Sequence, residues 1–476
     1  MLIGKKAPRK RPALPSSPGR VKSLLLYLLL LISGAAVLPL RVDEVLQLQA
    51  SREGSMTGLI AWVARTPGAA PLNYVFQAPV IAMLGNSRLS ARMLTFVFAV
   101  AACYVFSHLA DRISKIYRQQ ATMVFAVLPA HYVAAVSATP AEQGLFFLLL
   151  GTVWFFRLVS TPTIASAAVY SSLLTLCIYS EPYTFLPAIG YVLFLLRFVD
   201  RAHERRALWY VLSATALPPL LFLPYYIWAT PQADPNWLFA PSSAAPVYTQ
   251  AVAQLSAAGA LSYLLSGIMI VGALTAGWIS FRARTLAFAK RIALFCLFGG
   301  ILTTGALTVV FDTLNRSPVR ISHMLGATPA AILLCFAALQ WASVAFAKTF
   351  TRRAASIVAA TLAVLCVASD AQYLRANRTV DLRAEASALA TEVTPDSCVV
   401  FVSEHLSRYL FLVFHPELEY RECRQFFQGK VVLAIHPFVR LDQRQDAETY
   451  FRGLGFAESR RLRVGGGEIV TFRQNR

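Results

Sequence analysis

Long apolar runs dominate the first three quarters of the chain. They cover residues 23–40, 94–110, 121–138, 144–160, 164–180, 183–196, 207–229, 260–280, 292–311, 324–346 and 354–373. A helix needs about 20 apolar residues to cross the hydrocarbon core of a bilayer, and each run approaches or reaches that length. We therefore predict an all-α polytopic membrane domain over residues 23–373, with about 11–13 transmembrane helices. The apolar stretch 71–85 is shorter, and we expect it to be re-entrant or interfacial unless a neighbouring span is misassigned.

Basic residues gather between the apolar runs. The clusters are Arg112/Lys115/Arg118, Arg197/Arg201/Arg205/Arg206, Arg282/Arg284/Lys290/Arg291 and Lys348/Arg352/Arg353. Residues 1–22 also hold seven basic side chains and no acidic one. Cytoplasmic loops of membrane proteins carry such an excess of Lys and Arg. This pattern predicts a multi-pass membrane protein with a basic cytoplasmic tail over 1–22 and its C-terminus on the opposite, periplasmic or extracellular side. The last residues, Gln474-Asn475-Arg476, do not form a eukaryotic retention signal, which favours the cell inner membrane of a bacterium.

Residues 374–476 change in character and predict a small C-terminal α/β soluble domain. Alternating apolar residues predict strands at 398–403, 431–435 and 468–472, and helical patterns cover 381–392 and 443–454. The run Gly465-Gly466-Gly467 lies between strand-like segments, which favours a hairpin turn over a phosphate-binding loop. The domain also holds Cys398 and Cys423, which could form a disulfide if it faces an oxidising compartment.

Composition agrees with a membrane protein. Apolar residues make up 57% of the chain and charged residues 14%, which excludes a soluble globular enzyme, a disordered chain and a disulfide-rich secreted scaffold. The net charge is +20, but from Arg375 onward 15 basic residues face 13 acidic ones. Most of the excess therefore lies between the apolar runs, where the distribution of loop charges explains it better than a nucleic-acid partner.

An acidic pair, Asp43 and Glu44, follows the first predicted helix and opens the outer loop 41–73. Further along the chain stand Pro71, Leu72 and Tyr74, and then Gly85, Ser87 and Arg92. This order resembles the polytopic glycosyltransferases with the C-type fold, and in particular the branch of the protein O-mannosyltransferases and aminoarabinose transferases. The detailed match covers about fifty residues, and the many-helix architecture with an outer C-terminal domain extends it loosely over the chain.

The resemblance implies a membrane glycosyltransferase. Such an enzyme moves a sugar from a polyprenyl-phosphate donor to a cell-envelope lipid, glycan or protein acceptor with inversion, at the outer face of the membrane. Asp43 is then the candidate general base and Glu44 the second candidate, because one carboxylate can take the acceptor proton while the lipid phosphate leaves. A helix cap is the structural alternative for Asp43. No cofactor is required, although clustered outer carboxylates permit a divalent cation.

Candidate substrate-binding residues follow from the same resemblance and from the predicted topology. They are Arg41, Pro71, Tyr74, Arg92, Glu142, Glu181 and Arg320. Arginine would hold the lipid phosphate through its planar fork. Snorkelling at a helix end is an equal alternative for Arg320, and ordinary loop positions are alternatives for Glu142 and Glu181. The chain departs from the family at Gly68-Ala69-Ala70, where relatives often carry a basic or His-Pro residue, and at Ala141-Glu142-Gln143, near where many carry an Arg-x-Tyr element.

Two other functions fit the same gross composition. A transporter or lipid flippase is one, but transporters often show paired halves and binding sites near the middle of the bilayer. Here no repeat is visible, and the acidic residues gather on one predicted face. An inactive relative that binds lipid is the other, and the altered elements at Ala70 and Glu142 leave it open.

Overall fold

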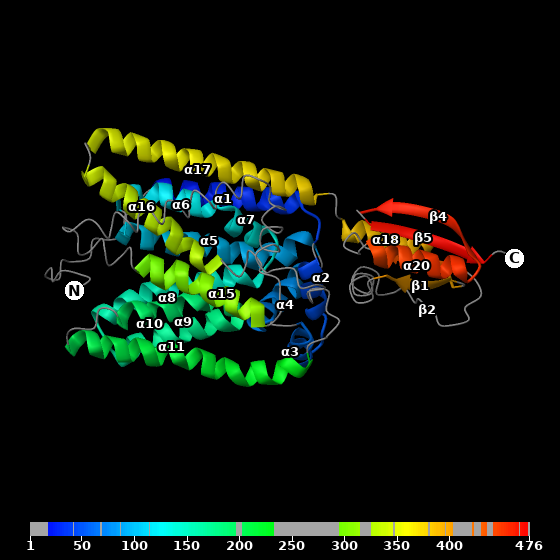
Figure 1. The fold of residues 1–476 in the computed structure, drawn as a ribbon, viewed down its shortest axis with the longest axis horizontal. Helices are drawn as coiled ribbons and strands as arrows, with labels where there is room; N and C mark the ends of the chain where they lie inside the picture. Colours follow the sequence, from blue (N-terminus) through cyan, green and yellow to red (C-terminus); the bar gives the residue numbers. More distant parts are fainter. Residues whose placement is uncertain are drawn as a thin grey trace.

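The computed structural model describes residues 18–40, 42–66, 69–85, 87–113, 115–196, 202–232, 295–314, 325–345, 348–378, 381–395, 397–402, 421–422, 430–435, 441–465 and 467–474. These residues form a long helical bundle and a smaller α/β domain, which lies beyond one end of the bundle (Figure 1).

The first part of the bundle turns around at one end. Its helices are α1 (Pro18–Val37), α2 (Val42–Ala50), α3 (Met56–Ala64), α4 (Leu72–Leu84) and α5 (Arg88–Ile113). Arg92, in the second turn of α5, donates hydrogen bonds to backbone carbonyls at the end of α1. Because α1 ends where α5 begins, the 13 residues of α4 do not cross the bundle, in agreement with the interfacial alternative. We call this end of the molecule the α2 end.

The chain then passes back and forth through the bundle. Its elements are η1 (Lys115–Tyr117), α6 (Arg118–Ala126), α7 (Pro129–Val136), α8 (Pro140–Ser160), α9 (Ile164–Ser180), η2 (Pro182–Phe185), α10 (Leu186–Leu196), α11 (Ala202–Ala229), η3 (Thr230–Gln232), the π-helix η4 (Phe295–Leu302), α15 (Thr303–Leu314), α16 (Thr328–Ala345) and α17 (Lys348–Asn377). Among the described residues, four helices have the length and hydropathy of membrane spans: Arg88–Ile113, Pro140–Ser160, Arg205–Gln232 and Ser356–Arg375. The span expected at 260–280 lies outside the described residues.

One predicted span is divided in two. Hydropathy predicts a single helix over the apolar run 121–138, but α6 ends at Ala126 and α7 starts at Pro129. Proline has no N–H to donate and forces the residue before it out of the helical region. Leu128 accordingly has extended angles, φ −67° and ψ 127°. The break turns the chain at a point where the hydropathy pattern alone is continuous.

The bundle is packed by apolar side chains inside and covered by apolar side chains outside. One continuous core joins buried residues from α1 to α17, including Phe106, Phe155 and Phe336. Large apolar side chains also point outward, as for Val97 and Val364, which are 59% and 68% exposed. A surface of this kind suits a hydrocarbon environment. The fold is therefore that of a polytopic all-α membrane protein.

The C-terminal domain is a five-stranded sheet with helices. Its elements are α18 (Leu382–Glu392), β1 (Ser397–Phe401), β2 (Arg421–Glu422), β3 (Lys430–Ile435), α20 (Leu441–Gly453), β4 (Phe456–Val464) and β5 (Gly467–Gln474). The strand order is β2-β1-β3-β5-β4, with β1 parallel to β2 and β3, and β5 antiparallel to β3 and β4. The predicted small α/β domain is confirmed. Cys398 is disulfide-bonded, and its predicted partner Cys423 lies outside the described residues.

The glycine run forms the turn of the β4–β5 hairpin. Val464 pairs with Gly467, so only two residues connect the strands. Gly465 has a φ of 62°, in the left-handed region that favours glycine. A side chain at Gly465 would also meet the backbone carbonyl of Asp381. The predicted hairpin turn is thus observed, and it is packed against the segment that leads out of α17.

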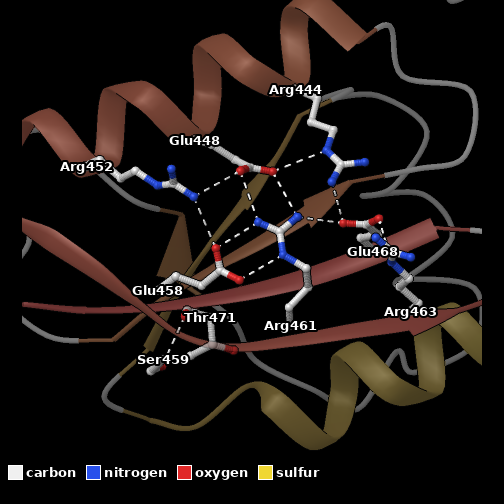
Figure 2. Close-up of polar contacts among 9 residues, drawn as sticks. All are labelled: Arg444, Glu448, Arg452, Glu458, Ser459, Arg461, Arg463, Glu468 and Thr471. Carbon is white, nitrogen blue, oxygen red and sulfur yellow. Dashed lines mark hydrogen bonds and ion pairs between the residues drawn. The ribbon is translucent and has the colours of Figure 1, made fainter.

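A network of ion pairs fastens α20 to the β4–β5 hairpin (Figure 2). At its centre, Arg461 donates hydrogen bonds to Glu448, Glu458 and Glu468, at distances of 2.7 to 3.1 Å. The hydrogen bond from Arg461 lowers the pKa of Glu458 below its usual value of 4.5. Burial raises the pKa of Glu448, but its hydrogen bonds with Arg461 and Arg444 outweigh burial, so that this pKa is also lowered.

Asp381 connects the α/β domain to the bundle. Its carboxylate accepts hydrogen bonds from the backbone N–H groups of Arg383 and Ala384 and so caps α18. The other carboxylate oxygen accepts a hydrogen bond from Arg88 Nη2 at 3.0 Å, at the first residue of α5. The domain is therefore held against the α2 end of the bundle (Figure 1).

Candidate functional site

Helix α2 carries the acidic pair singled out in the sequence. It starts at Val42, within five residues of the end of α1, and lies at the end of the bundle next to the α/β domain (Figure 1). Asp43 belongs to the first turn of α2, but its side chain lies outside the described residues, as does the whole of Arg41. Glu44 is completely buried. The backbone therefore places the pair at the α2 end, and only Glu44 can be followed in atomic detail.

Glu44 and Arg92 form a completely buried ion pair with two hydrogen bonds. Arg92 Nε lies 2.5 Å from Glu44 Oε1, and Nη2 lies 2.7 Å from Oε2. This bidentate arrangement is the strongest geometry available to arginine and a carboxylate. It joins the first turn of α2 to the second turn of α5. We refer to the two residues as the Glu44–Arg92 clamp.

Arg92 of the clamp also satisfies backbone carbonyls at the end of α1. Arg92 Nη1 donates to the carbonyl oxygens of Ala35 and Leu38, at 2.7 and 3.0 Å, and Nη2 donates to that of Pro39, at 2.8 Å. The carbonyl of Ala35 would normally accept from the N–H four residues later, but that residue is Pro39, which has none. With two bonds to Glu44 and three to carbonyls, all five N–H groups of Arg92 are used. The arginine that we expected to hold a lipid phosphate is thus engaged within the protein.

The segment that carries the family resemblance covers α4 and the corners at its two ends. Pro71 is buried and directly precedes α4, and Tyr74 is buried against Leu59 and Trp62 of α3. Gly85 ends α4 with a φ of 75°, a conformation that favours glycine. Pro71 and Tyr74 therefore belong to the corner between α3 and α4, and Gly85 to the corner between α4 and α5.

A second buried pair lies between α7 and α8. His131 Nδ1 is 2.9 Å from Glu142 Oε1, and both side chains are fully buried. The imidazole stacks on Phe125 with ring centroids 4.4 Å apart, and its Nε2 lies 3.3 Å from Cys103 Sγ. His131 is therefore a packed, hydrogen-bonded residue of the bundle interior. Within the described ranges, no three His, Cys, Asp or Glu side chains are grouped so as to hold a metal ion.

The corner between α7 and α8 is tied to α2. Gln47 of α2 donates from Nε2 to the carbonyl of Ala138 at 2.6 Å. Ala138 has a φ of 48°, which is strained for a residue with a side chain. In α8, Gly144 packs so closely on Thr184 and Glu181 that a side chain at position 144 would meet both residues. Glu181 therefore lies beside the start of α8, the helix that carries Glu142, at the α2 end, whereas Arg320 lies outside the described residues.

Three buried amides have no counterpart among the residues predicted from the sequence. Gln47, Asn73 and Gln143 are each no more than 2% exposed, and each has at least one buried polar atom without a hydrogen-bond partner. The sequence signal that could have identified them is the presence of carboxamide side chains within apolar stretches, close to the acidic residues. A search for charged and aromatic groups alone passes over them.

Two solved structures have the same fold as this chain. Both are of ArnT from Cupriavidus metallidurans. The apo structure has a TM-score of 0.58 and 14% identity and covers 95% of this chain and 97% of that chain. The structure bound to undecaprenyl phosphate has a TM-score of 0.59 and 13% identity, covering 96% and 98%. No family model and no curated protein matches the chain. The likeness to the C-type glycosyltransferase fold, expected from the sequence, is confirmed at the level of the fold.

Proposed function

We propose that the chain is a membrane glycosyltransferase that moves a sugar from a polyprenyl-phosphate donor to an acceptor in the cell envelope. The observation that carries the proposal is the position of the acidic pair. Helix α2 stands at one end of a membrane bundle, and the Glu44–Arg92 clamp fixes the backbone next to Asp43. The likeness to ArnT bound to undecaprenyl phosphate supports a lipid-linked donor.

The charge distribution supports a non-cytoplasmic position for this site. Arg112 lies in the last turn of α5 and Arg118 begins α6, so both are at the end of the bundle opposite to α2. Lys348 begins α17, which runs from that end to the α/β domain (Figure 1). Lys and Arg concentrate on the cytoplasmic side of membrane proteins. The disulfide at Cys398 also suits an oxidising compartment for the α/β domain. We therefore place the α2 end at the outer face of the inner membrane.

In the proposed reaction, an acceptor hydroxyl attacks the anomeric carbon of the donor sugar. The new bond joins the acceptor oxygen to that carbon, and the bond from the carbon to the lipid phosphate oxygen breaks. Asp43 takes the acceptor proton, and polyprenyl phosphate leaves with the electron pair. A single displacement of this kind inverts the configuration. Because every N–H of Arg92 is engaged, we assign the phosphate to Arg41 and Arg320.

The test is an Asp43→Asn variant of the full chain, purified in detergent and supplied with polyprenyl-phosphate sugars and an envelope lipid extract. Transfer should fall by a factor on the order of 100 or more, because the amide cannot accept the proton. Asp111→Asn is the matched control, since Asp111 pairs with Arg118 at the opposite end of the bundle. Covalent product in detergent, where no sealed compartment exists, separates transfer from transport. An Asp43→Asn protein that works as fast as the control would remove Asp43 from the base role.

A further inference from the structure

Carboxamide side chains at the α2 end have hydrogen-bonding atoms that the protein leaves unused. Both amide atoms of Gln143 are buried without a partner, and it is the one side chain with two such atoms in the described part of the chain. Gln47 Oε1 and Asn73 Nδ2 are in the same state. A buried polar atom without a partner costs roughly 1–3 kcal/mol, so a group of them calls for a ligand or water.

The three amides come from elements that meet. Gln47 bonds to Ala138, two residues before α8 begins, and Gln143 lies in the first turn of α8. Asn73 lies in the first turn of α4, which packs on α2 through Ala50 and Tyr74. Unpartnered atoms occur elsewhere too, as at Gln120 Oε1 in α6. The amides of α2, α4 and α8 differ because their elements meet at the α2 end, where helix α2 carries the acidic pair.

Carboxamides suit a neutral ligand that is rich in hydroxyl groups. Each amide can donate through its nitrogen and accept through its oxygen, as a sugar hydroxyl can, and neither partner carries a charge. A cationic amino sugar would instead favour an uncompensated carboxylate. Glu44 is paired with Arg92, and Glu142 contacts His131 through Oε1, so that only Oε2 of Glu142 lacks a partner. The unpartnered atoms of the three amides and Glu142 are thus four amide atoms and one carboxylate oxygen. The chemistry of the site therefore matches hydroxyl groups better than an ammonium group.

We propose that Gln47, Asn73 and Gln143 line a subsite for the transferred sugar and that this sugar is a neutral, hydroxyl-bearing one. The inference rests on the proposed function, because it requires a polyprenyl-phosphate sugar bound at the α2 end. In this arrangement the amides contact the sugar, the lipid phosphate lies beside it, and Asp43 faces the anomeric carbon. The three residues contribute to donor specificity rather than to proton transfer.

The experiment uses the full-length protein in detergent and the variant Gln143→Leu. Three probes are compared by equilibrium binding: undecaprenyl phosphate, undecaprenyl-phosphate hexose and undecaprenyl-phosphate amino sugar. We expect the wild type to bind the hexose lipid better than undecaprenyl phosphate. We expect Gln143→Leu to lose roughly tenfold in affinity for the hexose lipid, as for one lost neutral hydrogen bond. Its affinity for undecaprenyl phosphate should stay unchanged.

Two controls keep the test specific. Gln120→Leu makes the same substitution at the opposite end of the bundle and should alter neither affinity. Gln143 has no hydrogen-bond partner in the described protein, so its replacement by leucine should leave the melting temperature equal or higher, whereas a structural role predicts a lower one. Gln143→Met, with a flexible unbranched chain, serves as a second variant if leucine packs poorly.

The outcomes separate this inference from the proposed function. If wild-type protein transfers a hexose and Gln143→Leu binds the hexose lipid unchanged, the subsite assignment is wrong. If the wild type prefers the amino-sugar lipid, the assignment to a neutral sugar is wrong. If no polyprenyl-phosphate sugar is transferred at all, the proposed function itself fails.

Discussion

Removal of one partner of the Glu44–Arg92 clamp should destabilise the protein more than removal of both. In Arg92→Met, a buried carboxylate loses its partner, which costs about 3–5 kcal/mol. The same variant leaves the carbonyls of Ala35, Leu38 and Pro39 without a donor, at about 1–3 kcal/mol for each one that water cannot reach. The loss should therefore exceed about 5 kcal/mol.

The double variant Glu44→Met/Arg92→Met removes both charges. The carbonyls of Ala35, Leu38 and Pro39 then still lack a donor, but no charge is buried without its counter-ion, so we expect the double variant to be more stable than Arg92→Met alone by about 3 kcal/mol. Arg92→Lys is an intermediate case, because lysine keeps the charge but offers three donors in place of five.

The free energy of unfolding can be followed by tryptophan fluorescence as SDS is added to protein in mixed micelles. Wild type, both single variants and the double variant form a complete cycle. If the stability losses of the two single variants add up to the loss of the double variant, the two residues are not coupled. In that case the account of the clamp as a joint that orients α2 would be wrong.

The remaining predictions concern the α/β domain. Because the pKa of Glu458 is lowered in the folded state, its ion pair stabilises the domain above the ordinary value of 4.5, and that stability is lost as the pH falls through the lowered pKa. Hydrogen exchange of β4 and β5 between pH 3 and pH 7 should show a weaker pH dependence in Arg461→Leu than in Arg463→Leu, because the side chain of Arg463 is 78% exposed. An equal pH dependence in the two variants would contradict the assignment. Gly465→Ala should lower the stability of the domain by about 1–2 kcal/mol from its positive φ alone. Gly453→Ala is the control, because Gly453 has open space around it, and it should leave the thermal melt unchanged. Comparable losses of stability in the two variants would argue against strain at the turn.

Sequence periodicity predicted the elements whose environment is simple. The run 164–180 coincides with α9, and the glycine run forms the expected hairpin turn, because local hydropathy and backbone preference decide both. Helices such as α5 extend beyond their apolar runs, since charged and polar residues such as Arg88 and Arg112 continue the helix at its ends. The π-helix Phe295–Leu302 has no signal of this kind, because its sequence is as apolar as that of an α-helix.

The grouping of the candidate residues at one end of the bundle could be predicted from the sequence, but the contacts among them could not. Loop position and charge brought attention to Asp43, Glu44 and Arg92, and the backbone places them at one end of the bundle. However, the pairing of Glu44 with Arg92 spans 48 residues and depends on how α1, α2 and α5 pack. The bond from Gln47 to Ala138 spans 91 residues. Contacts at such separations are set by tertiary structure, and a single sequence carries no local pattern for them.

Helix α17 is an unbroken rod of 30 residues, or about 45 Å, and the α/β domain is attached only a few residues beyond it. A tilt of about 10° would swing the tip of such a rod by about 8 Å. The domain would then move together with the helix. The hydrogen bond from Arg88 to Asp381 lies near the end of α17 that carries the domain, where one contact has the largest effect on the tilt of the helix. The position of the α/β domain over the α2 end would thus depend on the inclination of one membrane helix.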